Sequence, residues 1–468
     1  YFARLPLSKS PTIVHGNALR IDWNDVVPAA RLSYILGNPP FVGKKEQDAD
    51  QKADMARVFA GVKGTGVLDF VAAWYLLAAK HIAGTTIRCA FVSTNSITQG
   101  EQVGVLWSEL YRCGIHIHFA HRTFKWTNEA RGKAAVHCII VGFGLAEEVP
   151  RRLFEYDQAD GEPHELLPST INPYLVDARE ILLLNRSAQL SGAPEMSYGS
   201  FALDDGNYTL DSEDRDKLLA ECKEAEVVLR PFVGGQELLH SELRWCLWLQ
   251  EVAPADLKRM PPVLRRVEAV KAWRESSGRE TTRKLAATPT LFAEVRQPKS
   301  SYVAVPTVSS ERRNYIPMAF LDANTIASNQ VYVLRDAALF HFGVLHSGMH
   351  MAWVRAVCGR LESRYRYSAG IVYNNFPWPE ISDDQHRAAI EAAAQGVLDA
   401  RDRFPGATLA DLYDPLTMPP ALVKAHQVLD RAVDAAYIAA EKAAGRKAPK
   451  LGSDAERVAF LFERYQAL

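Results

Sequence analysis

The sequence predicts an α/β protein in which a helix-wound sheet is followed by an α+β domain and a helical C-terminal region. Two patterns in the 468 residues support this prediction. Up to about residue 143, apolar strand-like runs alternate with amphipathic stretches, an order typical of parallel strands joined by crossover helices. Beyond residue 381 the composition becomes alanine-rich and helical. The length is sufficient for roughly two to four domains.

The first domain is expected over residues 1–165. Its predicted elements are short strands at residues 13–14 and 34–36, a helix at 67–81, and buried strands at 88–93 and 136–143. In sheets of this kind, ligands bind at the carboxyl ends of the strands. Residues that directly follow strands are therefore the first candidates for chemistry.

The second domain is expected over residues 166–380. Its predicted elements are a helix at 212–225 and strands at 302–308 and 330–334. Pro377-Trp378-Pro379 marks its end, because proline interrupts helices and central strands. The remaining residues, 381–468, are predicted to form a small helical bundle.

Composition and charge exclude several classes of protein. Hydrophobic residues make up 48% and charged residues 23%, which argues against a disordered or disulfide-dense chain. The net charge is -1, so any basic surface for nucleic acid must be local. The apolar run at residues 71–79 is shorter than the about 20 residues that cross a bilayer, and we expect no membrane contact. Six scattered cysteines, none in a zinc or redox spacing, indicate the cytoplasm.

The strongest motif is Gly37-Asn38-Pro39-Pro40-Phe41, directly after the strand predicted at 34–36. The two prolines restrict the backbone, so the Asn38 side chain and the Pro39 carbonyl become rigid acceptors. Two acceptors can bind both N–H groups of an exocyclic amine and direct its lone pair at an electrophile. Phe41 offers a face on which an extruded base can stack. The alternative is a sharp turn without catalytic purpose.

An Asn-Pro-Pro-Phe loop after a strand resembles the catalytic loop of amino-group methyltransferases that use S-adenosylmethionine. Longer stretches resemble MmeI-like type II restriction-modification enzymes, at residues 37–45, 90–102, 124–130, 309–317 and 367–379. Such enzymes join a nuclease, a methyltransferase and a target-recognition domain, and they methylate adenine N6 in one DNA strand. The resemblance implies a Rossmann-like class I methyltransferase sheet, incomplete at its N-terminal side, and double-stranded DNA as partner.

The resemblance also implies roles for residues of the first domain. Asn38, Pro39, Pro40 and Phe41 would hold and stack the flipped adenine. Phe124 or Trp126 would form the opposite aromatic wall, and the choice between them stays open.

The implied cofactor contacts lie at residues 13–23, which would be the third strand of the family's sheet. Asn17 and Ala18 would contact S-adenosylmethionine together with Asn38. Many family members have aspartate at the position of Asn17.

For Phe124 and Trp126 the alternative role is core packing. The polar residues Lys125, Asn128 and Arg131 argue against that role.

Sequence recognition is expected in the second domain, at Ser310, Glu311, Arg312 and Arg313. Arginine can read guanine and glutamate can read cytosine in the major groove. The alternative is a solvated loop held by salt bridges.

A basic segment at residues 258–284 holds nine basic and three acidic residues. Within it, Arg265, Arg266, Arg283 and Lys284 are candidates for phosphate contacts, which add affinity without reading sequence. A solvated helix face is an equally good interpretation.

Two further patterns are not expected to bind ligands. His116, His118 and His121 lie on a predicted alternating strand without nearby acidic partners, and we expect no metal there. Gly61, Gly64 and the glycine at 66 lack the strand and the Lys-Ser/Thr pair of a phosphate loop, so we expect a flexible loop near the active site.

The glycine-rich cofactor loop and the nuclease core of such enzymes are expected upstream of Tyr1. The fragment by itself should then bind S-adenosylmethionine poorly and be inactive. Two other functions stay open, a protein glutamine N-methyltransferase and a non-catalytic DNA-specificity module.

Overall fold

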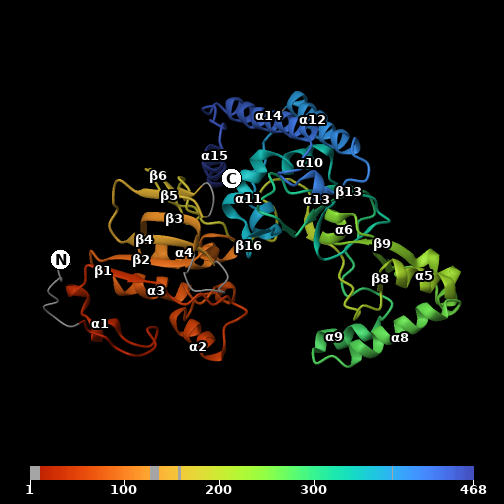
Figure 1. The fold of residues 1–468 in the computed structure, drawn as a ribbon, viewed down its shortest axis with the longest axis horizontal. Helices are drawn as coiled ribbons and strands as arrows, with labels where there is room; N and C mark the ends of the chain where they lie inside the picture. The colour runs from red at the N-terminus through yellow and green to blue at the C-terminus, as the bar shows by residue number, and fades with distance from the viewer. Residues whose placement is uncertain (1–10, 127–135, 157–159, 382) are drawn as a thin grey trace, which may run out of the picture. The chain divides into compact units, whose positions relative to one another are not determined.

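The computed structural model describes residues 11–126, 136–156, 160–381 and 383–468. The chain divides into two compact units, Tyr1–Asn185 and Arg186–Leu468, each of which is described separately. Colours from red to yellow mark the first unit in Figure 1, and colours from yellow-green to blue mark the second.

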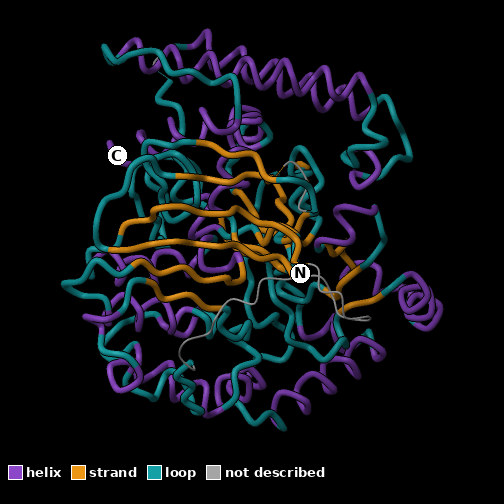
Figure 2. The backbone as a smooth tube through the Cα atoms, turned by 60° about the vertical axis from the view of Figure 1, so that its left-hand side comes forward, coloured by secondary structure: helices purple, strands orange, loops and turns teal. Residues whose placement is uncertain are grey.

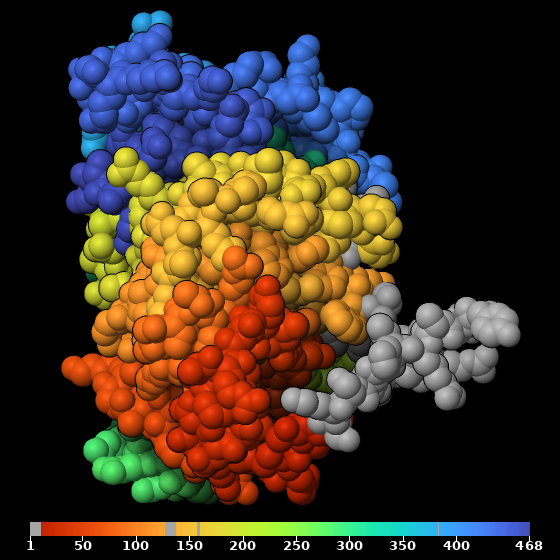
Figure 3. Space-filling view, turned by 90° about the vertical axis from the view of Figure 1, so that its left-hand side faces the viewer, coloured from red at the N-terminus to blue at the C-terminus, as the bar shows by residue number. Residues whose placement is uncertain are grey.

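The first unit is built on a six-stranded sheet in the order β1-β2-β4-β3-β5-β6. The strands are β1 (Tyr34–Gly37), β2 (Arg88–Thr94), β3 (His116–Trp126), β4 (Val136–Gly144), β5 (Arg152–Tyr156) and β6 (Pro163–Leu166). They lie side by side in the tube view (Figure 2). Red, orange and yellow residues follow one another across the visible face of this unit (Figure 3).

Strand directions decide which strand ends share an edge. β1 and β2 are parallel, and β4 runs antiparallel to both β2 and β3. β5 is parallel to β3. The carboxyl ends of β1, β2, β3 and β5 therefore lie at one edge of the sheet, where the fold class predicts ligand binding.

The helices of the first unit are α1 (Trp23–Val26), α2 (Ala49–Val58), α3 (Ala72–His81) and α4 (Glu101–Arg112), with 3-10 turns η1 (Ala29–Arg31), η2 (Thr65–Val67) and η3 (Asn95–Thr98). α3 is the crossover between β1 and β2, and most of its residues are small or apolar and buried. Its Tyr75 ring packs on Phe91 of β2 and Phe143 of β4 at centroid distances of 5.2 and 5.4 Å. This aromatic cluster is part of the core that supports the sheet.

Two predictions for this unit are wrong in detail. No strand forms at residues 13–14 within the described chain, where Ile13 and Val14 are 82% and 50% exposed, because a strand needs a paired neighbour. α1, not a third strand, lies near the implied cofactor contacts. The helix predicted from residue 67 begins at Ala72, because Asp69 binds two other loops instead of continuing a helix.

The second unit contains three smaller sheets, in the orders β14-β9-β10-β8, β13-β11-β15-β7 and β12-β17-β16. Their strands are β7 (Met196–Tyr198), β8 (Thr209–Leu210), β9 (Leu229–Val233), β10 (Trp245–Leu247), β11 (Tyr302–Pro306), β12 (Val308–Ser309), β13 (Ala319–Leu321), β14 (Ile326–Ala327), β15 (Val331–Leu334), β16 (Gly359–Leu361) and β17 (Arg364–Arg366). The strand predicted at 330–334 is confirmed as β15, whereas the one predicted at 302–308 is divided between β11 and β12, which belong to different sheets.

The helices that accompany these sheets are α5 (Ser212–Glu221), α6 (Gly235–His240), α7 (Pro254–Lys258), α8 (Pro261–Glu275), α9 (Glu280–Lys284), α10 (Leu339–Leu345) and α11 (Gly348–Val357), with 3-10 turns η4 (Lys223–Val228) and η5 (Leu285–Ala287) and the π-helix η6 (Ala369–Tyr373). The predicted helix at 212–225 thus ends at Glu221, and a 3-10 turn follows it. The C-terminal helices are α12 (Asp384–Asp402), α13 (Leu409–Leu412), α14 (Pro420–Ala443) and α15 (Asp454–Ala467).

The C-terminal helices belong to the same compact unit as the three sheets. α12 and α14 pack against each other through apolar side chains such as Val397, Leu429 and Val433, which are fully buried. α15 packs on α11. Within the described ranges, no helix is long and apolar enough to cross a membrane. All six cysteines are free thiols.

Candidate active site and nucleic-acid interface

The predicted catalytic loop leaves β1 at the shared carboxyl edge. Asn38 is exposed, Pro39 is buried and Phe41 is half-buried. The Phe70 amide donates to the Val42 carbonyl at 2.9 Å, which holds the end of the loop against the segment before α3. The Asn38 amide is thus presented to solvent from a backbone that is restrained on both sides.

Gly37 packs closely on the sheet. A Cβ at this position would lie 3.1 Å from a ring carbon of Phe91, which is buried beneath it. A side chain here would require the Phe91 ring to shift slightly. Glycine before Asn38 therefore lets the end of β1 pack closely on the Phe91 ring of β2.

Asp69 connects the catalytic loop with the loop that follows β2. One carboxylate oxygen accepts a hydrogen bond from the Lys44 amide at 3.0 Å, and the other accepts one from the Ser96 hydroxyl at 2.5 Å. Its own amide donates to the Gln102 side chain of α4 at 2.9 Å. The sequence analysis missed Asp69, because its partners lie 25 or more residues away along the chain.

We expect Asp69→Ala to lower the free energy of unfolding of the first unit by about 2 kcal/mol, because two donors lose their acceptor. Denaturant unfolding measures this change. Asp50→Ala is the matched control, since Asp50 is 91% exposed and 3.9 Å from Arg20, and it should cost less than about 0.5 kcal/mol. An equal loss in both variants would contradict the role of Asp69.

The loop after β2 also reaches β3. The Asn95 side chain donates to the Thr123 hydroxyl at 3.4 Å, one residue before Phe124. Together with Asp69, this contact links the carboxyl ends of β1, β2 and β3 by side-chain hydrogen bonds. The structure thus gathers the catalytic loop and the predicted aromatic wall at one edge.

The two candidates for the aromatic wall have different surroundings. The Phe124 ring stacks on Tyr156 of β5 with centroids 5.5 Å apart. Trp126 is 42% exposed and lies 6.1 Å from the Phe124 ring. Asn128 and Arg131, on which the argument against core packing partly depended, lie outside the described residues.

The predicted cofactor contacts at Asn17 and Ala18 belong to a local polar cluster. The Asn17 amide donates to Asp54 at 2.7 Å and accepts from the Leu19 amide at 2.9 Å. The Ala18 carbonyl accepts from the Trp23 indole at 2.9 Å. One N–H and one lone pair of the Asn17 side chain remain for a ligand.

Asp54 orients this cluster and was not predicted. It is 3% exposed, and Arg20 and Arg57 donate to the same carboxylate oxygen at 2.8 and 2.7 Å. Burial opposes ionisation, but the hydrogen bonds from Arg20 and Asn17 and the two positive charges outweigh it and lower the pKa of Asp54. A charged Asp54 thus fixes the direction of the Asn17 amide.

The glycine-rich segment lines a cavity within the first unit. Gly61 and Gly64 have φ angles of +83° and +79°, which favour glycine. The cavity measures about 510 Å³, and α4 forms another of its walls, where Gly104 lies close to the Leu183 carbonyl. The prediction that this segment is flexible and near the active site stays a prediction.

Two of the three histidines of β3 have acidic neighbours, contrary to expectation. Glu180 lies 3.5 Å from His116, and Glu148 lies 3.9 Å from His118. Burial lowers the pKa of His118 and of His121. Across the described residues, no group of three potential ligands is arranged to hold a metal.

The predicted recognition loop follows β12 in the second unit. Glu311 and Arg313 are half-buried, whereas Arg312 is exposed. In the described part of the chain, none of the three side chains takes part in an ion pair, so a salt-bridged loop is the wrong interpretation. Burial lowers the pKa of Arg313, although the negative charge of Asp414 opposes this shift.

A second set of arginines lies beside this loop and was not predicted. β17 pairs with β12, so that Arg366 is opposite Val308 and Tyr365 is opposite Ser309. Arg364 and Arg366 are exposed on the hairpin of β16 and β17, with the buried Tyr365 between them, and Arg364 forms an ion pair with Glu362 at 2.9 Å. Alternation of Arg with an aromatic residue after Gly359 is the signal that could have identified the two-stranded ribbon of β16 and β17.

The basic segment uses its charges largely within the protein. Arg265 forms an ion pair with Glu221, and Lys284 forms one with Glu280 at 2.9 Å. Arg266 and Arg283 donate to the carbonyls of Asn207 and Ser277 at 2.9 and 2.7 Å. The solvated-face interpretation therefore gains support, and phosphate contacts by these four residues stay a prediction.

Arg274 is not on a phosphate-facing surface at all. Its side chain is fully buried and donates to the carbonyls of Ala202, Leu203 and Leu291 at 2.9 to 3.1 Å. Burial lowers the pKa of this guanidinium. Arg274 organises the loops around α8 and cannot contribute to a basic surface.

Comparison with known families covers nearly the whole chain. The family models for the MmeI DNA-methyltransferase domain, target recognition domain and C-terminal domain match residues 2–155, 177–380 and 381–468. The chain belongs to the MmeI family. The fold predicted from sequence, a methyltransferase sheet followed by a recognition domain and C-terminal helices, is confirmed.

Individual MmeI-family relatives agree with this assignment. A protein of Bacillus subtilis (strain 168) described as DNA methyltransferase A is 40% identical over 466 residues, which are 99% of this chain and 51% of that protein. The solved structure of the type IIL restriction-modification enzyme MmeI in complex with DNA is 48% identical, with a TM-score of 0.88 over 100% of this chain and 61% of that one. The chain thus spans about half the length of the curated relative.

Proposed function

We propose that this chain is the methyltransferase and target-recognition portion of a restriction-modification enzyme that methylates adenine N6 in double-stranded DNA. The observation on which the proposal rests is the position of Asn38, exposed at the carboxyl edge of β1 in a chain of the MmeI family. The relative solved with DNA supports DNA as the partner.

Asn38 and Pro39 supply the chemistry of the proposed transfer. The Asn38 side-chain oxygen and the Pro39 carbonyl accept the two N–H groups of a flipped adenine. The amine lone pair then points away from the ring plane, and the methyl group is transferred by direct displacement without a covalent enzyme intermediate. Phe41 stacks on one face of the base.

We assign the second face of the base to Trp126. Its ring is 42% exposed, whereas the Phe124 ring is already stacked on Tyr156. A base between Phe41 and Trp126 is shielded from water, which strengthens its hydrogen bonds to Asn38 and Pro39.

S-adenosylmethionine is the methyl donor that this family implies, and it supplies an electrophilic sulfonium methyl group. The residues present fit one end of it: Asn17 keeps one N–H and one lone pair free of Asp54 and Leu19, and Asn38 is exposed. Among the described residues β1 is the outer strand of the sheet, with Tyr34 59% and Leu36 73% exposed, so a further strand has room to pair with it. We propose that further residues of a longer polypeptide hold the rest of the cofactor, so that this chain by itself binds it poorly and is inactive.

Methyl transfer tests the proposal directly. The polypeptide extended to the length of its relatives is incubated with S-adenosylmethionine labelled in the methyl group and with duplex DNA. Label on adenine N6 at one sequence supports the proposal. Label on a glutamine-containing protein substrate instead would establish a protein glutamine N-methyltransferase, and sequence-specific binding without transfer would establish a DNA-specificity module.

DNA sequence is read, in this proposal, by Ser310, Glu311, Arg312 and Arg313. The exposed Arg364 and Arg366 on the neighbouring ribbon contact phosphates on either side of these residues. Arg265, Arg266, Arg283 and Lys284 stay candidates for additional phosphate contacts. Six free cysteine thiols support the expected cytoplasmic location.

The double variant Arg364→Ala/Arg366→Ala should weaken binding to all duplexes alike. Each lost phosphate contact reduces the slope of log K against log salt by about 0.9. Binding is measured by fluorescence anisotropy at several salt concentrations. Lys217→Ala is the control for lost positive charge, since Lys217 lies on α5 in an exposed ion pair with Glu213. An unchanged salt slope in the double variant would contradict the phosphate contacts.

A further inference from the structure

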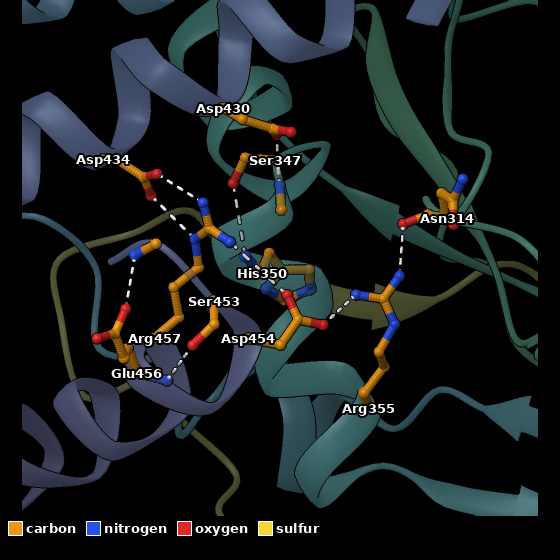
Figure 4. A network of polar contacts seen from close by, with 12 residues as sticks. Asn314, Ser347, His350, Arg355, Asp430, Asp434, Ser453, Asp454, Glu456 and Arg457 are labelled. Carbon is orange, nitrogen blue, oxygen red and sulfur yellow. Dashed lines mark hydrogen bonds and ion pairs between the residues drawn. The ribbon is translucent and has the colours of Figure 1, made fainter. Parts of the chain in front are cut away.

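The segment that follows the recognition loop, residues 314–318, is held at three points, by α11, α14 and α12 in turn. The first point is the Asn314 carbonyl, which accepts a hydrogen bond from Arg355 of α11 at 3.1 Å. Arg355 in turn donates to Asp454, in the first turn of α15, at 2.6 Å (Figure 4). α15 thereby fixes the guanidinium that holds the end of the loop.

The second point is Tyr315, which contacts α14 in two ways. Its hydroxyl donates to Asp430 at 2.7 Å, and its ring stacks on His426 with centroids 3.9 Å apart and planes at 18°. The other oxygen of Asp430 accepts from the Gly348 amide at 2.6 Å (Figure 4). Asp430 therefore joins the segment after the recognition loop to the start of α11, where a helix favours negative charge.

The third point is the Met318 carbonyl. Arg401 of α12 donates to it at 2.8 Å, and the Arg401 side chain is only 8% exposed. The same guanidinium binds the Tyr413 hydroxyl at 2.5 Å and His346 at 3.0 Å. Because each of these groups is buried, the position of Met318 relative to α12 is rigid.

The recognition loop is thus clamped at both ends. Its first end, Ser309, pairs with Tyr365 of β17, and its second end is held by Tyr315. Between these points, Glu311 and Arg312 have no ion pair in the described chain that could fix them. The backbone ends therefore decide where the reading side chains lie.

We propose that Tyr315 and Asp430 are positioning residues through which the C-terminal helices set the DNA sequence preference of the recognition loop. The inference rests on the proposed function, because it requires that residues 310–313 read base edges. Reading by hydrogen bonds tolerates little displacement, since a bidentate contact needs both donors in line.

Tyr315→Phe tests the inference by removing one hydroxyl group while keeping the ring on His426. The chain and its variants select duplexes from a library with a randomised window, and affinities are then measured for the selected duplex and for duplexes changed at one base pair. We expect Tyr315→Phe to lose about fivefold or more in discrimination at the base pairs read by the loop. Affinity for unrelated duplexes and the salt slope stay unchanged.

Tyr437→Phe is the matched control. Tyr437 lies on α14, the helix that Tyr315 contacts, and it is fully buried. Like Tyr315 it donates a hydrogen bond through its hydroxyl, but its acceptor is the Pro377 carbonyl at 2.7 Å. This variant should keep the discrimination of the unaltered chain. Asp430→Asn is the second test, because it removes the charge shared by Tyr315 and Gly348, and it should reproduce the loss.

Three outcomes overturn the inference. Discrimination unchanged in both Tyr315→Phe and Asp430→Asn would show that the contact does not set preference. An equal loss in Tyr437→Phe would show that general destabilisation is the cause. An unaltered chain that selects no sequence would instead refute the proposed function, and the inference with it.

Discussion

Asn38→Ala abolishes methyl transfer by the polypeptide extended to the length of its relatives and spares DNA binding. This is the expected result with the largest effect, a fall of at least about a hundredfold in kcat, comparable to the loss of one oriented hydrogen-bonding group in other active sites. The alanine side chain cannot accept a hydrogen bond from the adenine amine. The lone pair of the amine nitrogen is then no longer directed at the methyl group. Asn38 is exposed and follows β1 directly, and its loss should leave the fold intact.

Single-turnover methylation and duplex binding measure the two parts of this prediction. Asn38→Asp should retain more activity than Asn38→Ala, because a carboxylate also accepts hydrogen bonds. Asn24→Ala, which removes another exposed asparagine of the same unit, should change neither quantity. Full activity in Asn38→Ala would exclude the Asn-Pro-Pro-Phe loop from catalysis.

Mild acid should destabilise the second unit steeply. His346, His350 and His426 are fully buried. Burial lowers the pKa of His350 and of His426 to about 3, and it lowers the pKa of His346 as well. Unfolded histidine has a pKa of about 6.5, so below that pH the unfolded chain binds protons that the folded chain does not.

The sign of the pH effect follows from this difference. Stability is complete above pH 6.5 or so, and it falls by about 1.4 kcal/mol per pH unit for each of the three histidines as the pH drops below this value. Burial raises the pKa of Asp430, which adds stability as the pH falls and so opposes the loss caused by the histidines. The histidine effect begins at about pH 6.5, where the unfolded imidazole titrates.

Denaturant unfolding between about pH 7.5 and 5.5 measures the slope. His350→Phe should reduce it by up to about 1.4 kcal/mol per pH unit, because one proton-binding difference is removed. A free energy of unfolding that stays constant over this range would contradict the prediction. His15, which is exposed in the other unit, offers a control substitution that should leave the slope unchanged.

The predictable part of the site is the part encoded by consecutive residues. The Asn38 loop follows from an apolar strand that runs into two prolines, and β1 ends at Gly37, one residue beyond the predicted strand at 34–36. β2 and β4 are recognisable as continuous apolar runs, because both lie inside the sheet. The strand predicted at residues 13–14 is wrong because two consecutive apolar residues do not show whether a partner strand exists.

Charged residues predict the DNA-contacting surface less well than hydrophobic patterns predict strands, because the sequence does not show which charged side chains are buried. Arg274 and Arg312 are indistinguishable as letters, yet one is fully buried among carbonyls and the other is exposed. Arg364 and Arg366 gained importance only from the pairing of β17 with β12.

The sequence by itself determines the acceptor loop, the family and the order of the domains, because residues that are neighbours along the chain encode them. Folding contributes the partners that are distant in sequence: Asp69 for the loop, Asp54 for Asn17, and Asp430 for Tyr315. These hydrogen bonds join residues 25 to 115 positions apart. Such contacts depend on distances of about 3 Å in space, and no pattern along the chain encodes those distances.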